Sequence, residues 1–465
     1  MSVLPGVEVR VSAQAIPSGA PTDTGRLFAV GITERGPTTP TVVSGLGGFR
    51  RLFGGPTSYD TLSTPLAAFF AASEGAGDVV VARVVGPAAA PSEKTVSDGT
   101  DDTITFKAAW PGAAGDDITV IVAADGDGFQ LTVEYDGDVV ERWRGLEDVD
   151  DAVQTLQASE WIRAENEAAG SGNPSNGSYD LENGDDDRSN IVDATWESTL
   201  AGIPADLGPG QVVAPGRTSS TGRGQLVAHA EATNRIAFLD AAEGDAKAEL
   251  NAAAGDSGSR QAALFAPWLH LRLDGRIRTV PASVVAAGIC ARIDADAPTA
   301  HTGPDITRAA LPGRFVDVDV DFGDADAGEL NGNGVNLFRS VRGQVLLRGF
   351  RTVSDAPEFE QLSQARYIMS VSSRLASISD LYVFRALTPQ VIGDYGSDLA
   401  AELLGDFQAG ALFGDAPDDA FGVDVSPDVN PPQQLEQGVL RARVSVTPAP
   451  LAERIVIDLI KTRIG

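Results

Sequence analysis

A regular alternation of apolar strand-like and amphipathic helix-like segments between residues 191 and 300 constrains the fold most strongly. The pattern predicts buried strands in "GQVVAPG", "RIAFLDA" and "QAALFAPWLHLRL", with helices in "TGRGQLVAHAEAT", "DAKAELNAAAG" and "SVVAAGICARID". Strands that alternate with helices favour a mainly parallel sheet covered by helices on its faces. We therefore expect an α/β core in this part of the chain.

The segments on either side of this core have different sequence patterns, which predict further domains. Short alternating strands with Asp/Gly turns and one closing helix predict a β-rich module inserted between the halves of a larger unit. The polar stretch 170–190 that follows is expected to be a linker or a mobile loop. Two helices followed by two alternating strands predict an α+β C-terminal domain. With 465 residues, the chain divides into 1–25 (arm and linker), 26–87 (α/β segment), 88–190 (inserted β-rich module and acidic linker), 191–355 (α/β core) and 356–465 (C-terminal α+β domain with terminal strand).

The first strand-like segment places Val7, Val9 and Val11 on one face. Residues 12–25 read as a linker, so this strand has no obvious hairpin partner nearby. It is expected to join a distant sheet, either in its own subunit or in another. The alternative, a terminal strand that closes the sheet of its own domain, stays open.

The last hundred residues end in two strand-like segments, "GVLRARVSVTP" and "ERIVIDLIKTRI". In the first, Leu440, Ala442, Val444 and Val446 share one face. From residue 437 onward basic side chains outnumber Glu453 and Asp458: they are Arg441, Arg443, Arg454, Lys461 and Arg463. In a chain this acidic, a local basic excess indicates a contact surface for an acidic partner, although solvated strand faces explain it equally well.

Net charge and cysteine content exclude several classes of protein. The formal charge is −30 and the pI about 4.3, so the chain repels nucleic acid and no direct nucleic-acid partner is expected. No stretch reaches the ~18 apolar residues of a membrane helix, and no secretory signal is visible. One cysteine and three histidines do not favour a disulfide framework or a structural zinc site, and no cofactor is expected.

Two serines invite a catalytic interpretation. "GDSGS" places Ser257 in a protease-like loop, but His229, His270 and His301 lie in unrelated contexts. Ser283 follows an apolar strand, yet Pro281 and Val285 occupy the positions where a hydrolase elbow has glycines. We expect Ser283 near a helix cap and the lone Cys290 as a small buried hydrophobe, so no enzyme activity is predicted.

Clusters of acidic residues and of glycines are weak indications of a Ca²⁺ or phosphate site. In "DVDVDFGDADAGELNGNGVN" (317–336), Asp324 and Asp326 begin an EF-hand pattern, but Gly328 replaces the third ligand. A solvated acidic loop is expected there, with an irregular Ca²⁺ site as the alternative. The acidic run 185–187 is assigned to the linker. The glycines at 45–48 lack the lysine of a phosphate-binding loop.

Taken in order, several stretches resemble the tail sheath proteins of contractile phage tails and related contractile injection systems. They begin with "LPGVEVR", "GITERGP" and "FRRLFGG", and continue with "LAAFFAASEGAGDVVVARVVG" and "AAWPGAAGDDITV". The strongest is "AALFAPWLHL…RTVPASVVAAGICARID", and "VNLFR…LLRGFRTVS" and "GVLRARVSVTPAPLAERIVIDL" follow. One departure is "ADAPTAHTGPDI", where the family often has a Trp-containing, Pro-Ala-Asn stretch.

The resemblance implies a structural polymer without enzyme activity. The family forms hexameric rings that stack as a helical sleeve around a tail tube, and the sleeve contracts to drive the tube through the target envelope. Implied partners are further copies of the chain, the tube, the baseplate and the tail terminator, with no membrane insertion. The implied location is a bacteriophage virion tail assembled in the host cytoplasm, where contraction serves genome ejection. The implied fold is a subtilisin-like sheath core with extended terminal strands.

The resemblance also implies how neighbouring subunits join. In the family, terminal strands of neighbours extend a sheet of the C-terminal domain, and flexible linkers (12–25 and 448–452) absorb rotations. Residues implied in strand augmentation are Val7, Val9, Val11, Leu440, Ala442, Val444, Ile455, Ile457 and Leu459. The basic residues listed above would contact the tube or a neighbour. Alternatives are the sheath of a phage-derived extracellular injection system, an α/β hydrolase-like enzyme, or a surface or adhesion protein built on the inserted module.

Overall fold

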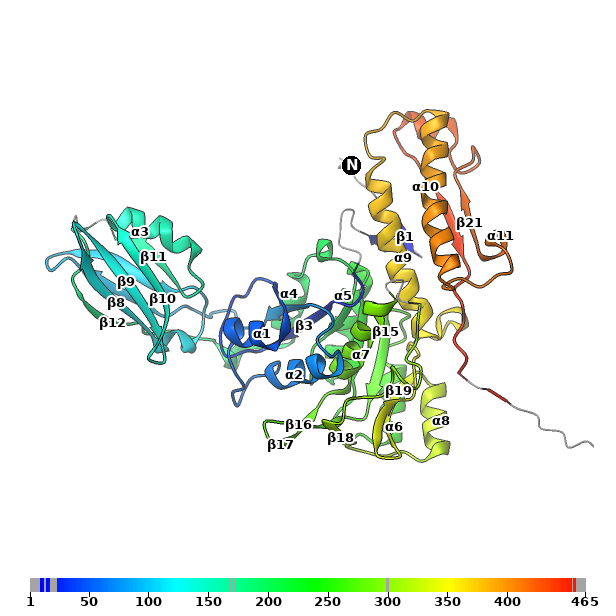
Figure 1. Ribbon diagram of the computed structural model, residues 1–465, viewed down its shortest axis with the longest axis horizontal. Coiled ribbons are helices and arrows are strands. Elements are labelled where there is room, and N and C mark those ends of the chain that lie inside the picture. The colour runs from blue at the N-terminus through cyan, green and yellow to red at the C-terminus, as the bar shows by residue number, and fades with distance from the viewer. Residues whose placement is uncertain are drawn as a thin grey trace, which may run out of the picture.

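The computed structural model describes residues 9–11, 14–16, 23–167, 169–170, 172–297, 301–453 and 455–456, with backbone only for the first two ranges. It shows a core from which two lobes project (Figure 1). One lobe is the β-rich module formed by residues from about 88 to 190. The other is the C-terminal helical domain.

The core is built on one eight-stranded sheet. Its inner strands are parallel, while β4 and β20 are antiparallel edge strands. Strands from both sides of the inserted module share this sheet. In spatial order they are β20 (Gln344–Leu347), β19 (Val335–Val341), β15 (Ala262–Ala266), β14 (Ile236–Asp240), β13 (Gln211–Val213), β3 (Leu27–Gly31), β5 (Val79–Arg83) and β4 (Thr41–Val43).

Helices cover both faces of the sheet, which explains why its central strands are continuous apolar runs. Every residue of β3, β5, β14 and β15 is buried. On one face pack α1 (Gly45–Phe53), α2 (Ser63–Ala72) and α7 (Ala282–Asp296). On the other pack α4 (Asp193–Ala201), α5 (Ser220–Thr233), α6 (Lys247–Gly255) and α8 (Asp324–Gly332).

A small antiparallel sheet lies at one end of the core. It consists of β16 (Leu269–Leu273), β17 (Arg276–Val280) and β18 (Phe315–Val318), with β16 in the middle. The acidic stretch 317–336, expected to be a solvated loop, instead contains α8. Lys247 pairs there with Asp326 and Glu329, and Arg339 pairs with Asp324. Among the residues that the structure describes, no three potential ligands cluster as a metal site would need.

The inserted module has its own hydrophobic core between two sheets. The first sheet has the order β10 (Asp138–Leu146), β9 (Gly128–Tyr135), β8 (Ile118–Asp125), β12 (Gly177–Asp180), and the second β11 (Ile162–Asn166), β7 (Asp102–Ala108), β6 (Glu93–Ser97), with α3 (Val149–Thr155) beside them. The expectation that residues 170–190 form only a linker is wrong. β12 pairs with β8 in register Gly177↔Val122, although its four residues carry too little apolar pattern to be recognised.

The C-terminal domain is built on α9 (Leu362–Asp380) and α10 (Pro389–Gln408), followed by the short α11 (Pro417–Ala420) and α12 (Pro432–Glu436). A two-stranded sheet, β21 (Phe421–Asp424) with β22 (Arg443–Val446), packs on this pair. α9 joins the domain to the core: Leu362 and Met369 belong to the core's cluster, whereas Val371 and Leu375 belong to the domain's own. None of the helices described is long and apolar enough to span a bilayer.

The chain ends differ from expectation in two ways. β1 (Val9–Val11) does have a hairpin partner, β2 (Gln14–Ile16), which lies inside the segment expected to be a linker. The pattern missed it because three residues are too few to show alternation. At the other end, the strand expected over 453–464 is absent at Glu453, Ile455 and Val456. The remainder of that segment lies outside the described residues.

Candidate assembly site

The strand-to-helix turn at residues 280–283 is buried architecture. Ser283 is fully buried, and its hydroxyl and amide donate to the two carboxylate oxygens of Asp240, both at 2.8 Å. Asp240 ends β14 and caps α7 from outside the helix. Ser283 lies next to the cap, as expected, but its hydroxyl donates to Asp240 instead of accepting from the first turn of the helix. A hydroxyl that donates to a buried carboxylate and has no access to solvent cannot attack a substrate.

The other nucleophile candidates are equally constrained. The hydroxyl of Ser257 donates to the carbonyl of Ala253 at 3.2 Å. Burial raises the pKa of the Cys290 thiol to about 12, so the thiolate that cysteine chemistry needs is not formed at neutral pH. His229 bonds Arg235 at 2.9 Å, and burial lowers its pKa to about 4. Each of these groups therefore serves packing.

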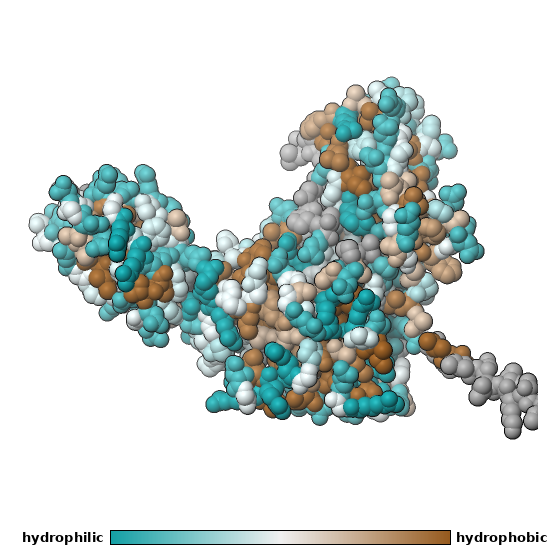
Figure 2. Space-filling model, viewed as in Figure 1, coloured by the Kyte–Doolittle hydropathy of each residue, from teal (hydrophilic) through white to brown (hydrophobic). Residues whose placement is uncertain are grey.

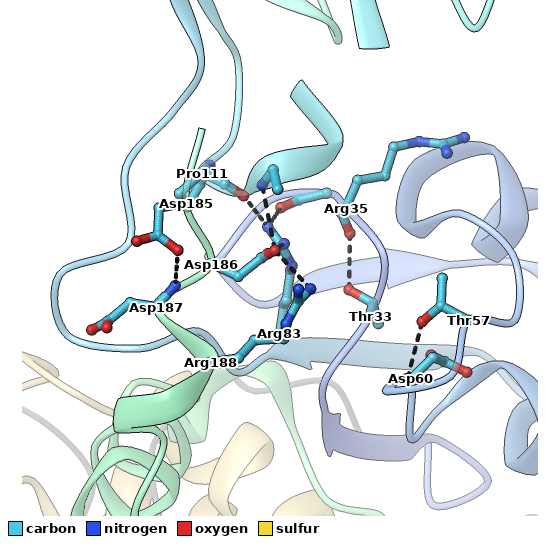
Figure 3. Close-up of polar contacts among 12 residues, drawn as sticks. Thr33, Arg35, Thr57, Asp60, Arg83, Pro111, Asp185, Asp186, Asp187 and Arg188 are labelled. Atoms are coloured by element: carbon cyan, nitrogen blue, oxygen red, sulfur yellow. Dashed lines mark hydrogen bonds and ion pairs between the residues drawn. The ribbon is translucent and has the colours of Figure 1, made fainter. Parts of the chain in front are cut away.

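A buried ion pair fixes the inserted module to the core (Figure 3). Arg83 ends β5, is nearly inaccessible to solvent, and donates to Asp186 Oδ1 at 2.8 Å. Its other terminal nitrogen donates to the carbonyls of Gly36 and Pro111 at 2.8 and 2.7 Å. Burial lowers the pKa of Arg83 to about 10, and the Asp186 charge opposes that shift. The acidic run at 185–187, assigned to a solvated linker, is thus partly buried at the joint.

A second set of contacts braces the same joint. The Tyr135 hydroxyl of the module donates to Glu34 of the core at 2.7 Å. The Arg35 guanidinium lies 4.4 Å from the centre of the Tyr135 ring and 5.1 Å from that of Trp161. Arg51 pairs with Glu160 across the same boundary. The module is therefore held at several points rather than tethered by two strands alone.

The C-terminal domain is fixed to the core by another buried pair, Arg366 on α9 with Asp294 on α7. The Thr24 hydroxyl, where the N-terminal arm enters the core, donates to the same Asp294 oxygen at 2.8 Å. Both charged side chains are almost fully buried. The backbones of β1 and β2 also lie beside α9. Core, C-terminal domain and N-terminal arm therefore meet at one point.

The residues predicted for strand augmentation fall into three groups. Leu440, Ala442 and Val444 pack with their apolar face on the C-terminal domain, with Val444 in β22. Val9 and Val11 lie in β1, and Ile455 is 79% exposed outside any strand. Val7, Ile457 and Leu459 lie outside the described residues, and none of these placements tests a contact between subunits.

The basic residues predicted for the tube or neighbour contact are only partly described. Arg441 and Arg443 are exposed on the face of the β22 segment opposite to its apolar one. Arg443 stands across from Asp424 in the ladder. Arg454, Lys461 and Arg463 lie outside the described residues.

Sequence reasoning missed the residues that hold the lobes in place. Arg83 and Arg366 are single charges inside the apolar runs "VVVAR" and "QARYIM". A lone charge in a buried run is a usable signal, because an unpaired buried charge is too costly to retain. Their partners lie 103 and 72 residues away along the chain, which no local pattern reveals.

Comparison with solved structures gives the fold. The chain superimposes on the sheath tail protein from Listeria innocua with a TM-score of 0.63 over 87% of this chain and 89% of that one, at 13% identity. The chain has the sheath tail protein fold. A sheath tail protein from Desulfitobacterium hafniense gives a TM-score of 0.57 at 15% identity, covering 90% of this chain and 93% of that one.

The sheath fold extends over nearly the whole chain in a further comparison. The helical sheath of the anti-feeding prophage in its contracted state gives a TM-score of 0.57 at 16% identity, over 99% of this chain and 97% of that one. The mixed α/β architecture of this chain, with one large sheet, therefore matches that of sheath proteins. No family model and no curated protein matches the sequence.

The buried Asp186 yields a stability prediction. Asp186→Ala leaves the Arg83 guanidinium buried without its carboxylate, which should cost about 3–5 kcal/mol of unfolding free energy. Asp185→Ala is the matched control, since Asp185 is exposed and accepts one backbone hydrogen bond; it should cost about 1 kcal/mol. Denaturant unfolding followed by tryptophan fluorescence measures both. Equal losses would contradict the role given to the ion pair.

Asp240 yields a pH prediction. Burial raises its pKa to about 6 from 3.8, so the folded state binds this proton more tightly than the unfolded state. Its contribution to stability is full below pH 4 and is lost as the pH rises through 6. Relative to Asp240→Asn, the wild type should lose up to about 3 kcal/mol between pH 4 and 7. Unfolding curves of both proteins at each pH test this, and a constant difference would refute it.

Proposed function

We propose that this chain is the structural subunit of a contractile sheath. The observation that carries the proposal is the fold match to a contracted helical sheath over 99% of the chain. The collinear series of sheath-like motifs in the sequence supports it independently. The buried, inaccessible Ser283 and the inert Cys290 support a structural rather than an enzymatic role.

The proposal also covers how the copies assemble, how the chain is divided into domains and which particle they form. Copies of the chain stack as hexameric rings around a tail tube, between a baseplate and a tail terminator, and contraction drives the tube through the target envelope. The five-part division of the chain and the likeness of the core to subtilisin are also proposed. The particle is a phage tail whose contraction ejects the genome.

A second candidate is the sheath of an extracellular contractile injection system. The PVC sheath complex, described as an extracellular contractile injection system in its contracted state, matches 99% of this chain and 98% of its own at a TM-score of 0.56. The match to the sheath tail protein from Listeria innocua covers 87% of this chain. The two candidates share the subunit's mechanics and differ only in whether the particle carries DNA.

The physical basis of assembly is an incomplete sheet. In the part of the chain that the structure describes, β21 and β22 form a sheet of only two strands, which the helices α9 and α10 support on one face. Its apolar face packs on the domain, while its outer edges present backbone N–H and C=O groups. Terminal strands of neighbouring copies would satisfy those groups, which is β-augmentation.

Electron microscopy of the purified full-length protein, alone and with the particle's tube protein, tests the proposal directly. Hollow sleeves that enclose the tube are expected. Soluble subunits that never polymerise under either condition would refute the sheath function. DNA in the native particle separates the phage tail from the injection system.

The N-terminal arm yields a prediction about cohesion. Deletion of residues 1–15 should leave a folded, soluble subunit that forms no sleeves, because the core and both lobes keep their contacts. Val9→Pro should act similarly by removing one ladder N–H. Val9→Thr, which keeps the N–H and a β-branched side chain, is the control and should assemble. Normal sleeves from the deletion or from Val9→Pro would exclude augmentation by this strand.

The exposed arginines of the β22 segment yield a prediction about partner contact. Arg441→Glu with Arg443→Glu should weaken cosedimentation of the sheath with the tube, or of copies with each other, by about tenfold. Arg142→Glu with Arg144→Glu reverses two exposed arginines at the same spacing on β10 and serves as the control. If both double variants assemble like the wild type, these arginines contact no acidic partner.

A further inference from the structure

A cleft lined by arginines opens where the β16–β17 hairpin faces the connection between α1 and α2. Its volume is about 330 Å³. Three arginines line it, Arg50 from α1 and Arg276 and Arg278 from β17, against one acidic residue, Asp274. At the end of the core where this hairpin lies, hydrophilic residues are interspersed with hydrophobic ones on the face shown in Figure 2. The space is enough for one or two side chains of a partner.

The hairpin register places the two strand arginines on one face. Arg276 pairs with Leu273, and Arg278 with Leu271, so both lie on the face of those leucines. Arg272 pairs with Ile277 and lies on the opposite face. Within the described part of the chain, none of the three cleft arginines forms an ion pair within 4.0 Å, although the sequence contains 65 acidic residues. The cleft therefore carries a net positive charge on an acidic molecule.

Of the five parts of the chain, the inserted module carries the largest net negative charge. Residues 88–190 contain 24 acidic and 6 basic side chains. Exposed acids gather at the β8–β9 turn and at the β10–α3 connection, which adjoin because the Gly145 amide donates to Asp125 at 3.1 Å. We call this set the acidic end: Asp125, Asp127, Glu147, Asp148 and Asp150. Among the residues described, no arginine or lysine pairs with any of them.

The acidic end cannot swing back to its own core. β9 runs eight residues from Gly128 at the acidic end to Tyr135, which is hydrogen-bonded to Glu34 of the core. At ~3.4 Å per residue, the acidic end lies about 24 Å from that contact along the strand. The buried Arg83–Asp186 pair fixes the module there, and the module projects away from the core (Figure 1).

We propose that the arginine cleft of one copy of this chain receives the acidic end of a second copy. The carboxylates of the acidic end accept hydrogen bonds from the guanidinium groups, whose planar donor pairs match a carboxylate. The inference deepens the proposed sheath function by naming a contact between copies other than the terminal strands. It also offsets part of the repulsion between chains of charge −30.

Sedimentation equilibrium of the full-length chain at low and high salt tests the contact, because it needs neither tube nor sleeves. Arg276→Glu with Arg278→Glu should weaken self-association about tenfold at low salt, and so should Asp127→Lys with Glu147→Lys. The side chains of Asp127 and Glu147 cap no helix. Combining all four substitutions restores opposite charges across the contact and should restore association. Arg272→Glu, on the other face of the hairpin, should leave it unchanged.

The outcomes separate this inference from the sheath function. Restoration in the fourfold variant, together with weaker wild-type association at high salt, supports the contact. A wild-type chain that is monomeric at low salt, or reversed variants that associate normally, overturns it. If sleeves still form in that case, the sheath function stands without this contact. Loss of tube binding alone in the arginine variant would make the tube the occupant, which also overturns the inference.

Discussion

The ion pair between Arg366 and Asp294 lies where three parts of the subunit meet. α9 runs from the core's hydrophobic cluster into that of the C-terminal domain, and Arg366 lies on the part of the helix that packs on the core. Asp294 also accepts from Thr24, where the N-terminal arm enters the core. Both ions are buried, so removing either partner leaves an uncompensated charge. The pair therefore fixes the base from which the arm and the C-terminal domain project.

A second buried ion pair, between Arg83 and Asp186, holds the inserted module to the core. In the sheath function proposed above, the two joints would let the subunit move as a unit, and the segments between subunits would take up the change of the lattice. This division of roles fits an assembly whose subunits rotate as rigid bodies. In the proposed function the chain ends carry the contacts between copies.

The sequence pattern predicts the central layers well and the joints not at all. The strands β3, β5, β14 and β15 are buried apolar runs, and α7 follows β17 as its small residues indicate. The partners of Arg83 and Arg366 are distant along the chain, so their pairing follows from the fold and not from spacing. β12 and the β1–β2 hairpin consist of three or four residues each, which is too short for a period of two to stand out.

The predicted C-terminal strand is described at only three of its residues. "ERIVIDLIKTRI" alternates as a strand should, yet Ile455 and Val456 are exposed and outside any strand. An alternating segment forms a strand only when an edge is available to pair with, because its N–H and C=O groups need partners. In the proposed function, the partner edge for this segment lies on a neighbouring copy.

Hydrogen–deuterium exchange of the full-length protein, compared between dissociated subunits and assembled sleeves, tests the central claim most directly. The account predicts that the amides of β1, β21 and β22 exchange more slowly in the sleeve, because strands from neighbouring copies complete the sheet. Amides of the core strand β14, already hydrogen-bonded on both sides, should not change. Sleeves in which β1, β21 and β22 exchange as fast as in the free subunit would contradict the account.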